Sequence, residues 1–182
     1  MEKKNRIIRI ALLGPESTAK STLSEALAKH YKTVWVKEYA REYLSELAAK
    51  YTLNDILIIA REQLEQEKKA LSTANNFLFA DTELIISKVW CEDVFELCPN
   101  WITEKLIENK YDLYLLTYPD LPWEADELRE NPNRRKFLFE WYEKELISIQ
   151  ANYTIIKGED EQRFINCLAA IENFSSHSNF NL

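Results

Sequence analysis

The sequence predicts an α/β protein in which a five-stranded parallel sheet carries helices on both faces. Short apolar runs rich in β-branched and aromatic residues alternate with longer amphipathic runs along the whole chain. This alternation is typical of repeated strand–helix units, which build parallel sheets. The first run, residues 7–13, is almost continuously apolar. That composition indicates a strand buried on both sides.

The remaining elements follow in chain order. Strands are predicted at residues 7–13, 33–36, 77–80, 111–117 and 153–156. Helices are predicted at residues 20–30, 39–50, 57–70, 83–97, 102–109, 134–150 and 161–174. Residues 118–132 contain three of the five prolines and are expected to be irregular. The polar residues 175–182 are expected to fray.

Size and charge limit the possible functions. A length of 182 residues suits one domain, so residues 1–182 are treated as a single unit. The net charge of -7 argues against non-specific nucleic-acid binding, which depends on Lys and Arg. We find no apolar run long enough to cross a membrane and no signal-peptide pattern, so we expect a cytoplasmic protein. The three cysteines fit no zinc-binding spacing and are expected to be free thiols.

A phosphate-binding loop is predicted where the first strand turns into the first helix. Backbone N–H groups of such a turn and the amino end of the helix bind phosphate oxygens. Lys20 would reach the outer phosphates of ATP, and the Ser21 hydroxyl would bind Mg²⁺. Ala19 stands where the usual motif has glycine and lacks glycine's freedom at positive φ. The predicted phosphate-binding residues are Gly14, Glu16, Ser17, Thr18, Ala19, Lys20, Ser21 and Thr22.

A second short match has the wrong placement. Residues 109–112, Asn-Lys-Tyr-Asp, fit the guanine-binding tetrapeptide of GTPases. That tetrapeptide belongs after a strand, whereas here it precedes the fourth predicted strand. Ligands of parallel sheets bind at the carboxyl ends of strands. We therefore interpret these residues as a helix end and a strand start.

Further motifs are spread along the chain. They are Glu-Tyr-Ala-Arg-Glu-Tyr at 38–43, Asp-Thr at 81–82 with Lys-Val-Trp at 88–90, Cys-Pro-Asn-Trp-Ile at 98–102, Tyr-Asp-Leu-Tyr-Leu-Leu at 111–116, and Pro-Asp-Leu-Pro-Trp at 119–123 with Asp126 and Arg129-Glu130. Together with the phosphate loop, over residues 7–172, the sequence closely resembles the nicotinamide riboside kinase domain of NadR-type proteins. Glu83 and Glu127 depart from that family's pattern, where Asp and Gly are expected. The adenylyltransferase signature His-x-Gly-His is absent, so we expect that activity to reside in another protein.

The resemblance implies a P-loop nucleoside/nucleotide kinase-like fold and the ATP- and Mg²⁺-dependent phosphorylation of nicotinamide riboside to nicotinamide mononucleotide in NAD salvage. A kinase for another nucleoside or a nucleoside monophosphate is an alternative, as is a non-catalytic ATP-binding module. Strand-end carboxylates and an arginine-bearing loop favour an enzyme over a switch. The substrate partner would be a small molecule, with neither nucleic acid nor membrane involved.

Two carboxylates end predicted strands, and spacing alone does not distinguish their roles. Glu38 follows the second strand and could accept the proton of the ribose 5′-hydroxyl, or merely pair with Arg41. Asp81 ends the third strand and could serve Mg²⁺, or cap the next helix. In the kinases that the chain resembles, the third strand lies beside the loop strand. We therefore assign Asp81 to the metal and Glu38 to the acceptor.

The remaining predicted site residues lie largely in a lid segment, residues 119–135. Its arginines could close over ATP and stabilise charge on the moving phosphoryl group. A cationic nicotinamide ring should stack on an aromatic face; we expect Trp123 to supply it and Trp90 to serve mainly in packing. The predicted catalytic arginines are Arg129 and Arg134. The added nucleotide-binding residues are Arg135 and Gly158, and the substrate-binding residues are Glu38, Tyr39, Arg41, Asp81, Trp90, Asp120, Trp123 and Asp126.

Overall fold

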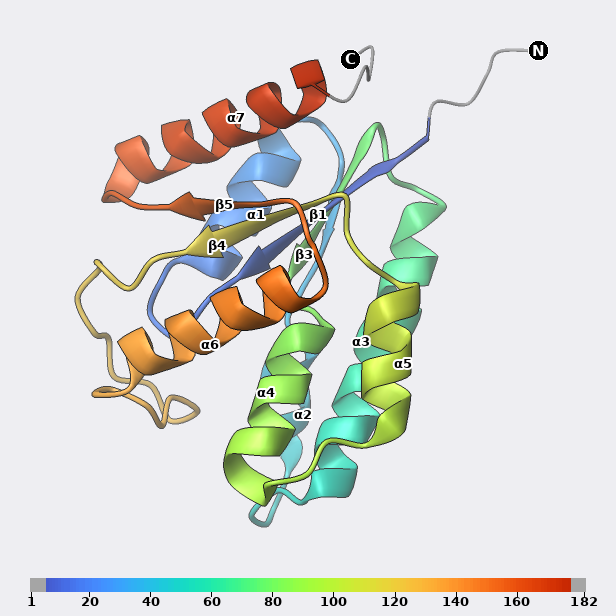
Figure 1. Ribbon diagram of the computed structural model, residues 1–182, viewed down its shortest axis with the longest axis vertical. Coiled ribbons are helices and arrows are strands. Elements are labelled where there is room, and N and C mark those ends of the chain that lie inside the picture. The colour runs from blue at the N-terminus through green and yellow to red at the C-terminus, as the bar shows by residue number, and fades with distance from the viewer. Residues whose placement is uncertain (1–5, 178–182) are drawn as a thin grey trace.

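The computed structural model describes residues 6–177 as one five-stranded sheet between two layers of helices (Figure 1). The strand order is β2-β3-β1-β4-β5, and every neighbouring pair is parallel. The strands are β1 (Ile8–Leu13), β2 (Val34–Val36), β3 (Phe77–Asp81), β4 (Leu113–Thr117) and β5 (Tyr153–Ile156). The helices are α1 (Lys20–His30), α2 (Tyr39–Glu46), α3 (Leu53–Leu71), α4 (Leu84–Phe95), α5 (Asn100–Glu108), α6 (Arg135–Ser148) and α7 (Asp160–His177). The predicted fold class is confirmed.

Alternate side chains of the central strand β1 pack into two separate hydrophobic cores. Ile8, Ile10 and Leu12 of β1 belong to the core covered by α1 and α7, whereas Ala11 and Leu13 belong to the core covered by α3 to α6. All five side chains are at most 3% exposed. Successive side chains of a strand point to opposite faces. A continuous apolar run is therefore what a sheet with two covered faces requires.

The strand order places the two predicted carboxylates at different distances from the phosphate loop. β3 pairs directly with β1, and Asp81 lies opposite Leu12. β2 pairs only with β3, so Glu38, which follows β2, lies one strand further out. The expected placement of both strands is confirmed. The residues that follow β1, β2, β3 and β4 all emerge at the same edge of the sheet.

The predicted element boundaries hold to within a few residues, with local exceptions. Helix α3 begins at Leu53 rather than residue 57, because Thr52 and Asp55 form a capping box. The expected fraying of residues 175–182 is wrong for 175–177, which continue α7, and Ser175 is only 2% exposed. Residues 178–182 lie outside the described range.

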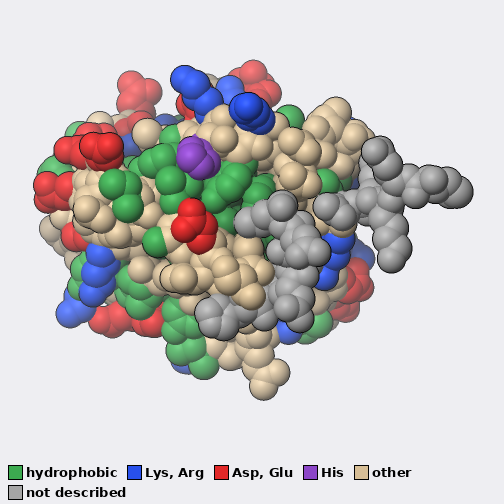
Figure 2. Space-filling model, turned by 90° about the horizontal axis from the view of Figure 1, so that it is seen from above, with side chains coloured by type: hydrophobic (Ala, Val, Ile, Leu, Met, Phe, Trp, Pro, Cys, Tyr) green, Lys and Arg blue, Asp and Glu red, His purple; other side chains and the backbone are tan. Residues whose placement is uncertain are grey.

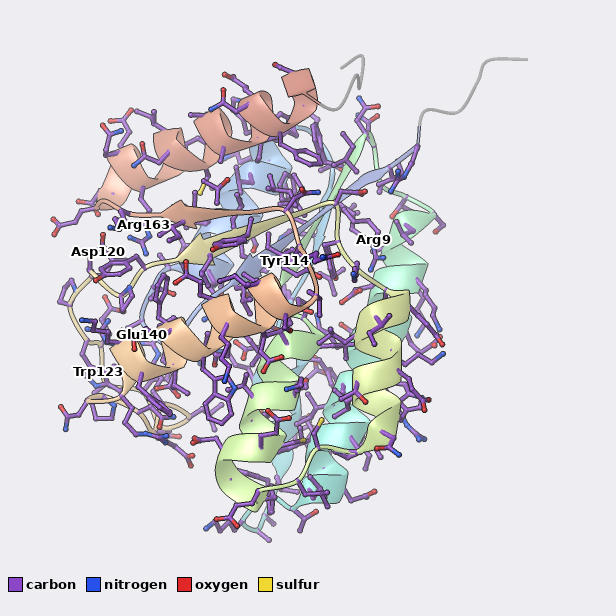
Figure 3. The ribbon with its side chains drawn as sticks, in the orientation of Figure 1. Arg9, Tyr114, Asp120, Trp123, Glu140 and Arg163 are labelled. Atoms are coloured by element: carbon purple, nitrogen blue, oxygen red, sulfur yellow. The ribbon has the colours of Figure 1, made fainter. Side chains whose placement is uncertain are left out.

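The tetrapeptide at 109–112 lies at the opposite edge from the phosphate loop, as expected. Asp112 precedes β4, and its Oδ2 accepts a hydrogen bond of 2.8 Å from the backbone N–H of Arg9 near the start of β1. Figure 3 shows Arg9 at the far end of the sheet from Asp120. The tetrapeptide therefore serves strand alignment rather than base recognition.

The face that carries α7 bears charges of both signs. Figure 2 shows acidic and basic side chains spread around this face, with hydrophobic side chains between them. Within residues 6–177, no helix combines the length and the apolar character that a bilayer span demands.

Arg163 of α7 ties together the segments that follow β4 and β5 (Figure 3). Its side chain is 1% exposed. Nη1 donates to Asp120 Oδ1 at 2.6 Å and to the carbonyl of Gly158 at 2.7 Å, and Nη2 donates to the carbonyl of Tyr118 at 2.6 Å. Burial raises the pKa of Asp120, but the Gly158 N–H and the Arg163 guanidinium lower it more, so the net shift is downward. Arg163 therefore fixes where the lid segment begins.

Replacing Arg163 should destabilise the whole fold. Arg163→Met leaves the Asp120 carboxylate and two carbonyls without their donor, so we expect the free energy of unfolding in urea to fall by about 3 kcal/mol. Lys144→Met, at an exposed basic residue of α6, is the matched control and should change it by less than about 0.5 kcal/mol. Equal, small effects of the two substitutions would show that Arg163 does not hold these segments.

Candidate active site

The phosphate loop adopts its motif conformation despite the missing glycine. Ala19 has φ 64° and ψ 24°, in the left-handed region, and Ser17 has φ 55°. A non-glycine residue in this region costs roughly 1–2 kcal/mol. The Ala19 carbonyl nevertheless accepts the first helical bond, at 2.9 Å from the Leu23 N–H. The alanine therefore keeps the concave arrangement of backbone N–H groups that binds phosphate, at a cost in strain.

Gly14 is required by a close approach to the end of β4. A Cβ atom at Gly14 would lie 2.2 Å from Thr117 Oγ1 and 2.7 Å from the Thr117 carbonyl oxygen. The Thr117 hydroxyl donates to the Leu13 carbonyl at 3.1 Å and lies 2.7 Å from the Thr18 hydroxyl. Thr117 is a site residue that sequence reasoning missed. The available signal was a polar residue ending an apolar strand, as at Asp81.

Asp81 and Ser21 form a pair suited to Mg²⁺. Asp81 is 1% exposed, Ser21 lies close enough to lower the pKa of its carboxyl, and its Oδ1 has no partner within the described residues. Burial raises the pKa of Asp81, although Lys20, Ser21 and Arg41 oppose the shift. A cation would satisfy the orphaned oxygen. Mg²⁺ typically binds one or two protein oxygens together with substrate phosphates, so it does not require a larger cluster of protein ligands. Within residues 6–177 there is no cluster of three His, Cys, Asp or Glu side chains.

Glu38 lies between the phosphate loop and the acceptor side of the site. It precedes α2, and its side chain is 26% exposed within the cleft described below. Burial raises the pKa of Glu38, Asp81 and Glu16 raise it further, and Lys20 and Arg41 lower it, with a net upward shift. The alternative pairing with Arg41 is long, at 3.9 Å, because Arg41 makes a 2.9 Å contact with Asp126 of the lid segment. The carboxylate is therefore not saturated by that arginine.

The lid segment is closed onto the phosphate loop. The Glu16 carboxylate accepts hydrogen bonds from the backbone N–H groups of Glu130 at 3.1 Å and Asn131 at 3.0 Å. The Ser17 hydroxyl accepts from Arg129 Nη1 at 3.1 Å. Two side chains of the loop thus hold the lid, and Arg129 is brought to the place where phosphates would bind.

The other two arginines of the segment have different partners. Arg134 forms a bidentate pair with Asp93 of α4, at 2.6 and 2.8 Å. Arg135 donates to the carbonyl of Leu121 at 2.8 Å and to that of Ser17 at 3.4 Å. Only Arg129 donates to a side chain of the phosphate loop. The geometry therefore favours Arg129 over Arg134 as the arginine that acts on the transferred group.

These elements enclose one cleft of about 1030 Å³. The predicted site residues that line it are Gly14, Glu16, Ser17, Thr18, Ala19, Lys20, Ser21, Thr22, Glu38, Arg41, Trp90, Arg129 and Arg134. Those that do not are Tyr39, Asp81, Asp120, Trp123, Asp126, Arg135 and Gly158. Asp120 is instead bound to Arg163 and to the Gly158 N–H, the latter at 2.8 Å. In this structure Asp120 therefore has a structural role, and its expected contact with the substrate stays a prediction.

The aromatic wall of the cleft differs from the expected one. Trp90 lines it together with Tyr51, and their rings meet edge to face with centroids 4.9 Å apart. Trp123 lies outside the lining residues, with the Arg135 guanidinium 5.8 Å from its ring centroid. This geometry reverses the expected order of the two tryptophans. Tyr51 lies in a short connection between α2 and α3, and its sequence position gave no signal of this contact.

A parallel sheet of this order with a phosphate loop after its central strand has the fold of P-loop nucleoside and nucleotide kinases. The family described as an AAA domain matches residues 9–163, and the chain belongs to that family. The trifunctional NAD biosynthesis/regulator protein NadR of Escherichia coli (strain K12) is 29% identical over 175 residues, which cover 89% of this chain and 41% of that protein.

Two solved structures give the same fold. A NadR protein in complex with NR superimposes with a TM-score of 0.79, and a NadR protein in complex with NAD and AMP-PNP with a TM-score of 0.74. Both are 18% identical to this chain and cover 93% of it, and the match covers 52% and 50% of theirs. The chain thus spans about half or less of the length of these relatives.

Substitutions of Asp81 and Glu38 should have different effects on how activity depends on Mg²⁺ concentration. Asp81→Asn should raise the Mg²⁺ concentration for half-maximal activity about tenfold, because the amide carries no charge for the cation. Glu38→Gln should lower kcat at least about a hundredfold, the contribution of a general base, with that concentration unchanged. Steady-state rates across a Mg²⁺ series measure both. A shift for Glu38→Gln with none for Asp81→Asn would reverse the assignment.

Proposed function

We propose that this chain phosphorylates nicotinamide riboside to nicotinamide mononucleotide with ATP, as a step of NAD salvage. The observation that carries the proposal is one cleft that joins a phosphate loop, a strand-end carboxylate and an aromatic wall. The similar proteins support it, since one is an NAD biosynthesis and regulator protein and another was solved in complex with NR. We further propose that the chain acts as a single kinase domain in the cytoplasm.

The donor half of the cleft would bind the phosphates of ATP. Backbone N–H groups of the loop and the amino end of α1 offer the matching donors, and Lys20 adds a charge beside them. Its Nζ donates to the Pro15 carbonyl at 3.0 Å, so the side chain already folds over the loop. Ser21 and Asp81 would hold Mg²⁺. When bound, the ion neutralises charge on the phosphates.

Glu38 would act as the general base on the acceptor. The raised pKa of Glu38 lies closer to neutral pH, and a general base is most effective when its pKa is near the operating pH. The proton moves from the ribose 5′-hydroxyl to Glu38 as that oxygen bonds to the γ-phosphorus and the bond to ADP breaks. Arg129, held by Ser17 at 3.1 Å, would stabilise the charge on the moving group.

The acceptor half suits a flat cation. Trp90 and Tyr51 present aromatic surface to the cleft. Acidic Glu38 and Glu130 lie along the same walls, whereas Asp93 is paired with Arg134. The positive ring of nicotinamide riboside gains from aromatic faces and from nearby carboxylates. A nucleoside monophosphate would bring an anion to these acids.

An acceptor panel tests the proposal. We expect nicotinamide riboside to give the highest kcat/KM in a coupled ADP-release assay with ATP and Mg²⁺, above thymidine, cytidine, deoxyadenosine and the nucleoside monophosphates. Product identity is checked by mass. A clear preference for any other member of the panel would replace the proposed substrate.

The two tryptophans should differ in their effect on the riboside. Trp90→Ala should raise KM for nicotinamide riboside roughly tenfold or more, since a desolvated cation–π contact contributes up to about 2 kcal/mol. Trp123→Ala is the matched control, with KM expected to change less than about twofold. KM for ATP should stay constant in both. A larger effect at Trp123 would restore the expectation drawn from its position in the lid segment.

A further inference from the structure

A small subpocket with both apolar and polar lining residues lies beside the acceptor half of the cleft. It has a volume of about 30 Å³ and shares Glu38, Ala40, Ile86 and Trp90 with the main cleft. Beyond these residues it is lined by Ile59, Gln63, Thr82, Glu83 and Ser87. Its size suits one water-sized polar group rather than a second ring. Residues of α3, α4 and the turn after β3 therefore bring several polar side chains to this end of the aromatic wall.

Gln63 lines this space and carries a side-chain donor that has no partner among the described residues. The residue is 5% exposed, and its Oε1 accepts the backbone N–H of Tyr39 at 3.0 Å. Because that bond occupies the oxygen, the amide orientation is set. Its Nε2 is buried with no hydrogen-bond partner among the described residues. A buried unpaired donor costs about 1–3 kcal/mol, so the side chain is poised for an acceptor oxygen.

The other polar residues keep the subpocket free of positive charge. Thr82, Glu83 and Ser87 are all at most 8% exposed. The Glu83 side chain accepts a hydrogen bond from the Ile85 N–H at 2.9 Å. With Glu38 at the mouth and no Lys or Arg among the lining residues, a carboxylate would meet no counter-charge here.

We propose that this subpocket receives the carbonyl oxygen of an uncharged carboxamide on the acceptor's ring, with the Gln63 side-chain amide as donor. This inference rests on the proposed function, because it takes the acceptor to be a pyridinium riboside whose ring lies against Trp90. Gln63 is then a specificity residue. The site distinguishes a carboxamide from a carboxylate and from a bare ring, whereas Trp90 contributes to all three alike.

The test compares three acceptors: nicotinamide riboside, nicotinic acid riboside and the riboside of unsubstituted pyridine. For the unsubstituted chain we expect kcat/KM for the carboxamide to exceed that for the bare ring about tenfold, and the acid to be poorest. Gln63→Met should bring the carboxamide and the bare ring within about twofold of each other. Gln66→Met, on the same helix and outside the subpocket, should keep the tenfold ratio.

The ratio isolates the proposed contact, since any displacement of Glu38 through the Tyr39 bond slows both acceptors equally. An unchanged ratio in Gln63→Met, or no preference in the unsubstituted chain, would overturn the inference while phosphorylation of nicotinamide riboside stands. Absence of that phosphorylation would overturn the proposed function itself. Should Gln63→Met fail to fold in a thermal melt, Gln63→Glu replaces it, because a carboxylate can still accept the Tyr39 N–H but has no amide donor. Its ratio should also fall to about two, and a ratio that stays at ten overturns the inference.

Discussion

The close packing of the ends of β1 and β4 is the constraint on which the site depends. Thr117 fills the space beside Gly14 so completely that a single added carbon would lie 2.2 Å from its hydroxyl oxygen. The same hydroxyl donates to Leu13 and lies beside Thr18. The start of the phosphate loop is thereby fixed against the most buried part of the sheet. Ser17 and Ala19, which follow Gly14 and have left-handed backbone angles, are positioned by this fixed start of the loop.

The anchor also sets the distance between the loop and the carboxylates. Parallel pairing of β3 with β1 holds Asp81 opposite Leu12, so the buried acid reaches Ser21 at the first turn of α1. Glu38 follows a strand one place further out and faces the cleft. The chemistry that we propose, with metal on one side and acceptor on the other, follows from strand order. No loop rearrangement is needed to separate the two roles.

Carboxylates hold the lid segment beside the phosphate loop, although that loop is expected to bind anions. Glu16 lies within the phosphate loop, where a carboxylate would repel ATP, and two backbone N–H groups of the lid satisfy it. Arg41 with Asp126 and Arg134 with Asp93 close the other sides of the cleft. Arginines and aspartates from opposite sides of the opening are thus paired with one another. The same contacts that hold the lid segment on the loop also place Arg129 beside Ser17.

The sequence by itself determined the α/β class, nearly all element positions and the loop residues, because burial on both faces and strand–turn–helix order leave direct signals in local composition. Strand order beyond that came from family resemblance. Only the tertiary structure decided which aromatic side chain lines the cleft and that Asp120 binds Arg163. It also decided that, within residues 6–177, the Gln63 donor has no partner. Each of these depends on contacts between residues distant in the chain, such as Gln63 with Tyr39. Local periodicity reports how a residue is buried, but it does not report which partner it meets.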